Sequence, residues 1–505
     1  MYTFILSLVI LILGYVFYGK YVDKVFGSDN SRPTPAIAQP DGVDYVPLST
    51  FKSLFIQFLN VVGTGPIFGA IAGVMFGPMA FVWIVLGCIF AGAVHDFFSG
   101  MLSVRMKGAT VGEIVGNNLG EFARQVMRIF SIILLVLVGV VFLTSPAQIL
   151  TSLVCGDKNA QLHAYVYNIF IVVIFVYYIL ATILPVDKLI GKLYPLFGLA
   201  LFFMAVGISI SLIYMNVTGK YYTPEITELA NKINYNSKFT LFPFLFISIA
   251  CGAISGFHAT QSPIIARCIK TEADGRKVFY AAMIGEGIVA VIWAAAAITL
   301  FGGTDHTIAA HLTGLAAAGK APVVVNKVAK ITLGSVGSVL AVLGVVAAPI
   351  TSGDTAFRGA RLSIADMLHL DQKSIKHRYM IAIPLFIVGG ILSQVDFNII
   401  WRYFAWSNQT LAMIGLWSAS TWLMKRKKNY LITLIPAIFM TLVCISYIII
   451  APEGFGRFFI DANKNITAQG SLISFVIAAI VAIIAIVVFF KSKARCEREN
   501  SYIED

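Results

Sequence analysis

The chain lacks the charge that keeps a soluble protein of its size in water. Only 12% of its 505 residues are charged and 58% are hydrophobic, whereas a soluble domain carries about 25% charged and about 45–50% apolar residues. A soluble enzyme, a disordered chain and a disulfide scaffold are therefore excluded. The short segments of alternating polarity that build outer-membrane barrels are missing as well.

Catalytic and metal-binding motifs are also scarce. The six cysteines are scattered without a C-x-x-C pair, and neither H-E-x-x-H nor G-x-S-x-G occurs. The segment from Gly314 to Lys320 matches a phosphate-binding loop until Ala321, where Ser or Thr would bind magnesium. We therefore expect neither an enzyme nor a nucleotide-driven pump. The net charge of +12 lies in short loops without interleaved aromatics, so nucleic acid is not an expected partner.

Long apolar runs dominate the sequence. A helix needs about 20 apolar residues to cross the hydrocarbon of a bilayer. The runs predict an all-α integral membrane protein with about 13 transmembrane helices. These spans cover residues 1–19, 52–77, 78–103, 126–154, 163–184, 187–214, 241–268, 276–301, 331–355, 379–394, 397–424, 430–450 and 470–490.

The basic residues predict an orientation. Thirteen spans place the termini on opposite sides of the membrane, and an outer Met1 puts most of the 37 Lys and Arg residues in inner loops. This is the arrangement that the positive-inside rule favours. We expect a bacterial inner-membrane protein with an outer N-terminus and a cytoplasmic C-terminus. A cysteine near Asn236 should then label from outside, and one near Lys373 should not.

Two spans contain helix breakers at mid-depth. Span 2 carries Gly63, Gly65 and Pro66, and span 7 carries several glycines, a proline and polar residues between 251 and 263. The two spans are five apart, which indicates an inverted five-helix repeat with a binding site near the midplane. The predicted units are a first helix with an inner loop (1–51), two repeats (52–214 and 241–424), and two accessory helices with a short inner tail (430–505).

Helix amino-termini and freed N–H groups at such breaks can hold a substrate carboxylate. The predicted substrate-binding residues are Asn60, Gly63, Thr64, Gly65, Ser255, Gly256, His258 and Gln261. On this reading, Gly65→Leu should abolish transport and leave the protein folded.

Several ionisable residues lie within or near the hydrocarbon. An acidic side chain at the bilayer centre costs about 2.5–3.5 kcal/mol, so each needs a partner or a task. His95 and His258 both lie seventeen residues into spans that run from outside to inside, so they can face each other. The predicted ion-coupling residues are Asp96, Glu286, Thr351, Ser352 and Asp354.

The same residues leave alternatives open. His95, Asp96 and His258 have the chemistry of a zinc site, and they equally suit a hydrogen-bonded cluster that locks the bundle. Thr351 and Ser352, with carbonyls freed around Gly63, suit sodium, although such hydroxyls also bond back to their own helix. No cofactor is required, and the coupling ion is H⁺ or Na⁺.

Several longer motifs resemble the carbon starvation protein A family. They are Arg32-Pro-Thr-Pro-Ala36, Gly63-Thr-Gly-Pro66, Ala91-Gly-Ala-Val-His-Asp-Phe97, Gly256-Phe-His-Ala-Thr-Gln-Ser-Pro263 and Ser352-Gly-Asp-Thr-Ala-Phe-Arg358. The family is similar to the amino acid–polyamine–organocation transporters, which implies a LeuT-type 5+5 inverted repeat. The resemblance implies an importer used in nutrient starvation, usually of peptides, and some relatives resemble pyruvate–proton symporters.

The sequence thus predicts a secondary active importer of peptides, coupled to protons, with the lipid bilayer and a small-molecule or peptide substrate as partners. A pyruvate–proton symporter is the first alternative. A channel or a nutrient sensor is the second, although the short tail after the last span leaves little room for a signalling domain.

Overall fold

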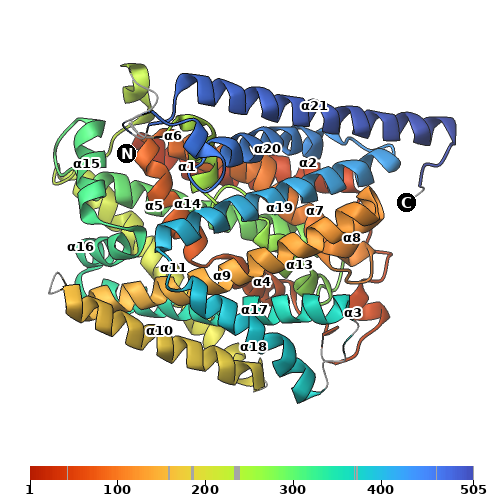
Figure 1. Ribbon diagram of the computed structural model, residues 1–505, viewed down its shortest axis with the longest axis horizontal. Helices are drawn as coiled ribbons and strands as arrows, with labels where there is room; N and C mark the ends of the chain where they lie inside the picture. Colours follow the sequence, from red (N-terminus) through yellow and green to blue (C-terminus); the bar gives the residue numbers. More distant parts are fainter. Residues whose placement is uncertain are drawn as a thin grey trace.

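The computed structural model describes residues 1–42, 44–156, 160–183, 187–231, 239–368, 370, 374–461, 463 and 465–503. These residues are largely helical, with one isolated β-bridge between Ile460 and Ile466. The long helices run side by side along the longest axis, and the two chain ends lie at opposite ends of it (Figure 1). This placement fits an odd number of spans. Asn236 and Lys373 lie outside the described residues.

The described residues of the first half of the chain form eleven α-helices. They are α1 (Tyr2–Leu13), α2 (Gly19–Phe26), α3 (Pro35–Ala38), α4 (Thr50–Val61), α5 (Thr64–Gly73), α6 (Met79–Gly87), α7 (Ala93–Arg105), α8 (Val111–Leu119), α9 (Glu121–Cys155), α10 (Ala160–Ile183) and α11 (Asp187–Val217).

The second half forms ten more. They are α12 (Leu241–Ser248), α13 (Phe257–Ala266), α14 (Ala281–Leu300), α15 (Ile308–Ala318), α16 (Ala321–Ala341), α17 (Ala348–Met367), α18 (Ile375–Leu392), α19 (Phe397–Lys425), α20 (Leu431–Ile450) and α21 (Ala468–Arg498). Short π-helical turns join α1 to α2, α6 to α7 and α16 to α17, and another leads into α14.

The chain is an all-α integral membrane protein. In the part that the structure describes, nine helices are long and apolar enough to cross a membrane, and the α4–α5 pair, bent by 50°, makes ten. The other predicted spans correspond to the α12–α13 pair, which is broken in its middle, and to α18 and α19. Exposed apolar side chains on α1, α10, α11, α18 and α21 form the surface that faces lipid.

Some predicted boundaries are wrong. The first helix continues past residue 19 to Phe26, because Val22 and Phe26 extend its buried face. Span 9 was expected at 331–355, but Gly334, with φ +61°, breaks the helix and the following segment runs on to Met367. The segment before this break, which was not predicted as a span, is helical in α15 and early α16.

The contacts between the helices have the symmetry of a five-helix inverted repeat. Exchanging the repeats maps the α4–α5 span onto α12–α13, and the α6–α7 span onto α14. Accordingly α14 packs on α4 and α5, and its counterpart α7 packs on α13. The third spans of the two repeats, α9 and α17, pack on each other, and α10 and α18 pack on α9 and α17 respectively. The core is therefore the predicted LeuT-type 5+5 arrangement, with breaks in spans 2 and 7.

Candidate functional site

The break in span 2 is short and leaves polar groups open. It consists of Val62 and Gly63 between α4 and α5, and Gly63 has φ −106° and ψ −142°. The Val62 and Gly63 amides donate to the carbonyls of Phe58 (2.8 Å) and Val61 (3.0 Å). Thr64 begins α5 with its side chain fully buried, and its hydroxyl has no hydrogen-bond partner among the described residues.

Two polar side chains of α4 also carry hydrogen-bonding groups without a partner among the described residues. Asn60 is partly buried and forms no side-chain hydrogen bond with the described residues. Gln57 is fully buried, and its amide donates weakly to Ser262 of α13 (3.5 Å) while its Oε1 atom has no partner among the described residues. The sequence analysis missed Gln57, although a lone glutamine in an apolar helix is a usable signal.

The break in span 7 is longer and its polar groups are satisfied from α19. Residues 249–256 are unwound between α12 and α13. Asn408 Oδ1 accepts hydrogen bonds from the Phe257 amide (2.7 Å) and the Ser255 hydroxyl (3.2 Å), and Asn408 Nδ2 donates to the Ala250 carbonyl. Gln409 Nε2 donates to the carbonyls of Phe246 (2.6 Å) and Ile249 (3.2 Å). The sequence analysis missed both α19 residues.

The two breaks touch each other at small residues. A methyl group placed on Gly65 would lie 2.5 Å from Cys251 Sγ, and one on Gly69 would lie 3.2 Å from the Ala250 amide. A Cβ atom on Gly256 would overlap the Asn408 carbonyl. Gly65 and Gly256 are therefore close-packing positions. The expectation that Gly65→Leu leaves the protein folded is at odds with this geometry, because leucine needs space that Cys251 occupies.

A buried chain of ionisable groups lies beside the span 7 break. One oxygen of Asp96 accepts a hydrogen bond from His95 Nδ1 (2.9 Å) and the other accepts from His258 Nδ1 (2.7 Å). The Nε2 atom of His258 lies 3.2 Å from Glu286, without the alignment of a hydrogen bond. All four side chains are at most 1% exposed. Helices α7, α13 and α14 thus supply one polar chain, which we call the Asp96 cluster.

Charge balance limits the protonation states of the Asp96 cluster. If both carboxylates are ionised and only His258 is protonated, the cluster carries a net charge of −1 in a site closed to water. Such a charge is costly in low dielectric. A proton on Glu286 restores neutrality while the Asp96–His258 pair remains. The cluster can therefore store an additional proton, and Glu286 has the fewest hydrogen bonds to lose.

The remaining predicted residues lie apart from this cluster or bond to near neighbours. Asp354 forms an ion pair with Arg358 (3.2 Å), within α17. Gln261 donates to Thr260 (3.0 Å). Thr351 and Ser352 also lie in α17, whose principal packing partner is α9.

An aromatic residue of α9 lies between α17 and the span 2 break. The Phe142 ring is 2.9 Å from a methyl position on Gly63, and its Cβ is 3.1 Å from one on Gly353. The sodium hypothesis, which needs Thr351 and Ser352 close to the carbonyls at Gly63, would require this ring to move. It stays a prediction.

The zinc hypothesis meets a comparable obstacle. Among the described residues, no group of three or more His, Cys, Asp and Glu side chains is arranged to hold a metal ion. Instead, both histidines direct Nδ1 toward Asp96. The residues present fit a hydrogen-bonded chain better than a coordination sphere, and zinc binding stays a prediction.

Relatives of the chain are membrane proteins and transporters. An uncharacterized membrane protein of Haemophilus influenzae is 44% identical over 58% of this chain and 89% of its own length. The peptide transporter CstA of Campylobacter jejuni is 28% identical over 87% of this chain and 78% of its own. The pyruvate/proton symporter BtsT of Escherichia coli is 28% identical over 57% of this chain and 47% of its own.

Two solved transporter structures align along most of the chain at low similarity. The Eremococcus coleocola manganese transporter has a TM-score of 0.49 and 13% identity, covering 91% of this chain and 99% of its own. The inward-facing conformation of Mhp1 has a TM-score of 0.48 and 14% identity, covering 90% and 95%.

The model of one family matches almost the whole core. Its matches span residues 1–158, 139–334 and 305–447, which include both repeats and the Asp96 cluster. The chain therefore belongs to the family described as carbon starvation protein CstA, a family of membrane transporters.

Proposed function

We propose that the chain is a secondary active importer that carries peptides across the bacterial inner membrane and is driven by a proton gradient. The observation that carries this proposal is the Asp96 cluster, which joins three helices of the two repeats through one carboxylate and one imidazole. Alternating access requires these helices to move relative to one another. A group that gains and loses a proton in the cluster changes the contacts between them.

The open polar groups at the span 2 break support a role in substrate binding. The first turn of α5 presents N–H groups that have no carbonyl partner within the helix, and Thr64 adds a buried hydroxyl without a partner among the described residues. Both features favour a carboxylate, which peptides and pyruvate share. A peptide also needs a partner for its amino group. Glu286 offers a carboxylate for that purpose, because its oxygens lie close to His258 but form no hydrogen bond with the described residues.

Pyruvate–proton symport is the second candidate, and the named relative in Escherichia coli favours it. Pyruvate has no amino group, so Glu286 would then serve the proton alone. In either case the proposed topology has an outer N-terminus and a cytoplasmic C-terminus.

Counterflow in liposomes tests the proposal. The purified protein is reconstituted and supplied with labelled dipeptide or labelled pyruvate, with proton and sodium gradients imposed separately. We expect accumulation of dipeptide with the proton gradient alone. Accumulation of pyruvate alone would favour the second candidate, and dependence on sodium would transfer coupling to Thr351, Ser352 and Asp354.

Amide variants of the acidic residues test which of them carries the coupled proton. Glu286→Gln should abolish gradient-driven accumulation and keep substrate exchange, because its shape is retained while its charge no longer changes. Asp96→Asn should impair both activities, since it also weakens the bonds to His95 and His258. Asp354→Asn is the comparison outside the cluster. Unchanged accumulation and pH dependence in both cluster variants would exclude Asp96 and Glu286 as proton carriers.

Metal analysis tests the zinc alternative separately. If zinc occupies the cluster, the purified wild type should retain about one zinc ion, which His258→Ala should lose. We expect zinc at background level in both proteins.

A further inference from the structure

A buried arginine without a partner among the described residues lies near the end of α17, outside the Asp96 cluster. Arg361 is only 7% exposed, and its Nε and Nη1 atoms form no hydrogen bond with the described residues. A buried charge without a counter-charge costs several kcal/mol. The position therefore indicates a missing anion.

The charged neighbours in the described part of the chain do not supply that anion. Those that act on Arg361 are Arg358, Arg378 and Asp354. The one acid among them, Asp354, is already 3.2 Å from Arg358. The site consequently keeps an excess of positive charge, which attracts an anion to the end of α17.

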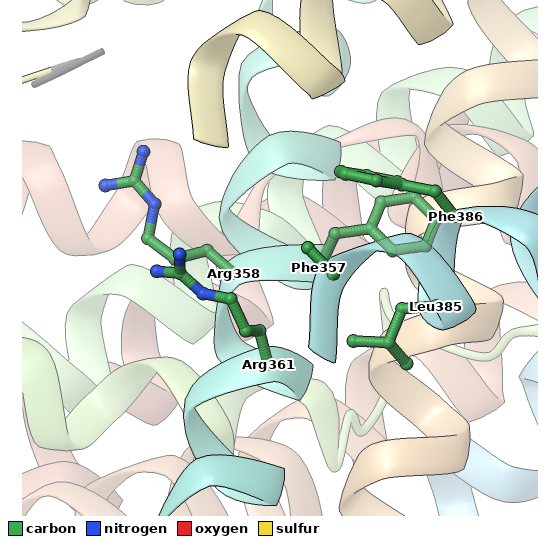
Figure 2. A pocket seen from close by; sticks show the side chains of 6 residues that line it. Phe357, Arg358, Arg361, Leu385 and Phe386 are labelled. Carbon is green, nitrogen blue, oxygen red and sulfur yellow. The ribbon is translucent and has the colours of Figure 1, made fainter. Parts of the chain in front are cut away.

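The arginine borders a narrow cleft between α17 and α18. Its walls are Phe357, Arg358, Arg361, Ala382, Leu385 and Phe386, and its volume is about 10 Å³. In Figure 2 the guanidinium groups of Arg358 and Arg361 lie together on one side, and Phe357, Leu385 and Phe386 lie on the other. A cleft of this volume holds about one water molecule, so a larger anion must bind at its mouth.

The outer surface of α18 suits the apolar part of such a ligand. It presents exposed apolar side chains over three turns, at Met380, Ile383, Ile387, Val388 and Ile391. In a membrane protein these side chains contact acyl chains. Cationic and lipid-facing surfaces therefore meet where α17 ends and α18 begins.

We propose that the mouth of this cleft binds the phosphate group of an anionic phospholipid. Arg361 donates paired hydrogen bonds to the phosphate oxygens, Arg358 adds a second positive charge, and the acyl chains lie along α18. Arginine suits this role because its planar donors match phosphate geometry. Basic sites between membrane helices recognise lipid headgroups in the same way. A lipid at this site would adjust the packing of α17, a core helix of the second repeat, against α18.

Thermal unfolding of the purified full-length chain tests the proposal. In neutral detergent, dioleoylphosphatidylglycerol should raise the unfolding temperature of the wild type, and dioleoylphosphatidylcholine should not. Arg361→Gln should lose this shift. In lipid-free detergent the same variant should unfold no lower than the wild type, because the substitution removes a charge that lacks a partner. Lys376→Gln, which changes an exposed cation at the start of α18, should keep the lipid shift.

Native mass spectrometry measures lipid binding to the wild type directly. The wild type should retain one phosphatidylglycerol molecule, with binding about tenfold weaker for phosphatidylcholine, because the choline cation of that headgroup is repelled by Arg358 and Arg361. Arg361→Lys should bind phosphatidylglycerol with intermediate strength.

Three results would overturn the proposal. The first is an equal phosphatidylglycerol shift in the wild type and Arg361→Gln. The second is the same shift from inorganic phosphate at millimolar concentration, which would make the ligand a soluble anion. The third is a wild type that neither shifts with phosphatidylglycerol nor retains it, which would leave Arg361 a purely structural residue.

Discussion

The breaks in spans 2 and 7 occupy corresponding places in the two repeats, yet they differ in how their polar groups are satisfied. In span 7 eight residues are unwound, and Asn408 and Gln409 of α19 bind both ends of the segment. In span 2 only Val62 and Gly63 are non-helical, and the hydroxyl of Thr64 has no partner among the described residues.

This difference indicates that the two breaks have different roles. A break whose groups are bound by protein is rigid and keeps His258 in position against Asp96. A break with unused donors and acceptors gains hydrogen bonds when a ligand arrives. We therefore expect variants at the span 7 break to affect folding and variants at the span 2 break to affect substrate binding.

The largest effect should follow from Asn408→Ala. The substitution removes the partner of the Phe257 amide, the Ser255 hydroxyl and the Ala250 carbonyl. Each buried group left without a partner costs about 1–3 kcal/mol, so the protein should lose most of its stability. Fluorescence-detected size-exclusion chromatography after heating measures the loss. Asn60→Ala is the matched control and should unfold like the wild type. Equal stability of the two variants would contradict the expectation that the span 7 break, and not the span 2 break, is important for folding.

Gly65→Ala should have the next largest effect. Its new methyl group would overlap Cys251, which should cost about 1–3 kcal/mol through displaced backbone and side chains. Combining it with Cys251→Gly removes both overlapping atoms and should restore part of the unfolding temperature. If the single variant is as stable as the wild type but inactive, Gly65 contacts substrate rather than Cys251.

Thr64→Val should weaken substrate binding without a loss of stability. Valine has the shape of threonine and lacks the hydroxyl, whose partner we expect to be the substrate. Loss of one such hydrogen bond corresponds to about a tenfold lower affinity. Binding of the substrate identified by counterflow, measured by calorimetry, and thermal unfolding of the same sample distinguish the two effects. A lower unfolding temperature with unchanged affinity would show that Thr64 is structural.

The smallest effect is expected at Lys320→Ala. Lys320 Nζ lies 2.6 Å from Asp396, which ties the turn between α15 and α16 to the start of α19. Both side chains are about half exposed, so the pair should contribute less than about 1 kcal/mol. Asp396→Ala should cost more, because Asp396 also caps α19 by accepting from the Asn398 amide (2.8 Å). A loss as large as that of Asn408→Ala would mean that the ends of α19, as well as its middle, hold the span 7 break.

Much of the candidate site could be predicted because its signals are local. Glycine and proline in an apolar run identify a broken span wherever it packs. The equal depth of His95 and His258 follows from counting residues along two parallel spans, and the structure brings both to the carboxylate of Asp96. The short helices α8 and α15 were missed, because only long apolar runs were used to find helices.

The sequence by itself determined the class of protein, the two broken spans and the family, because hydropathy and helix breaking act within one segment. Only the tertiary structure showed that Asn408 satisfies the span 7 break, that Cys251 occupies the space next to Gly65, and that two guanidinium nitrogens of the buried Arg361 have no hydrogen-bond partner among the described residues. Asn408 and Phe257 are 151 residues apart. The physical reason is that a polar group in a membrane is satisfied by whichever segment packs against it, and pattern within one segment does not specify that neighbour.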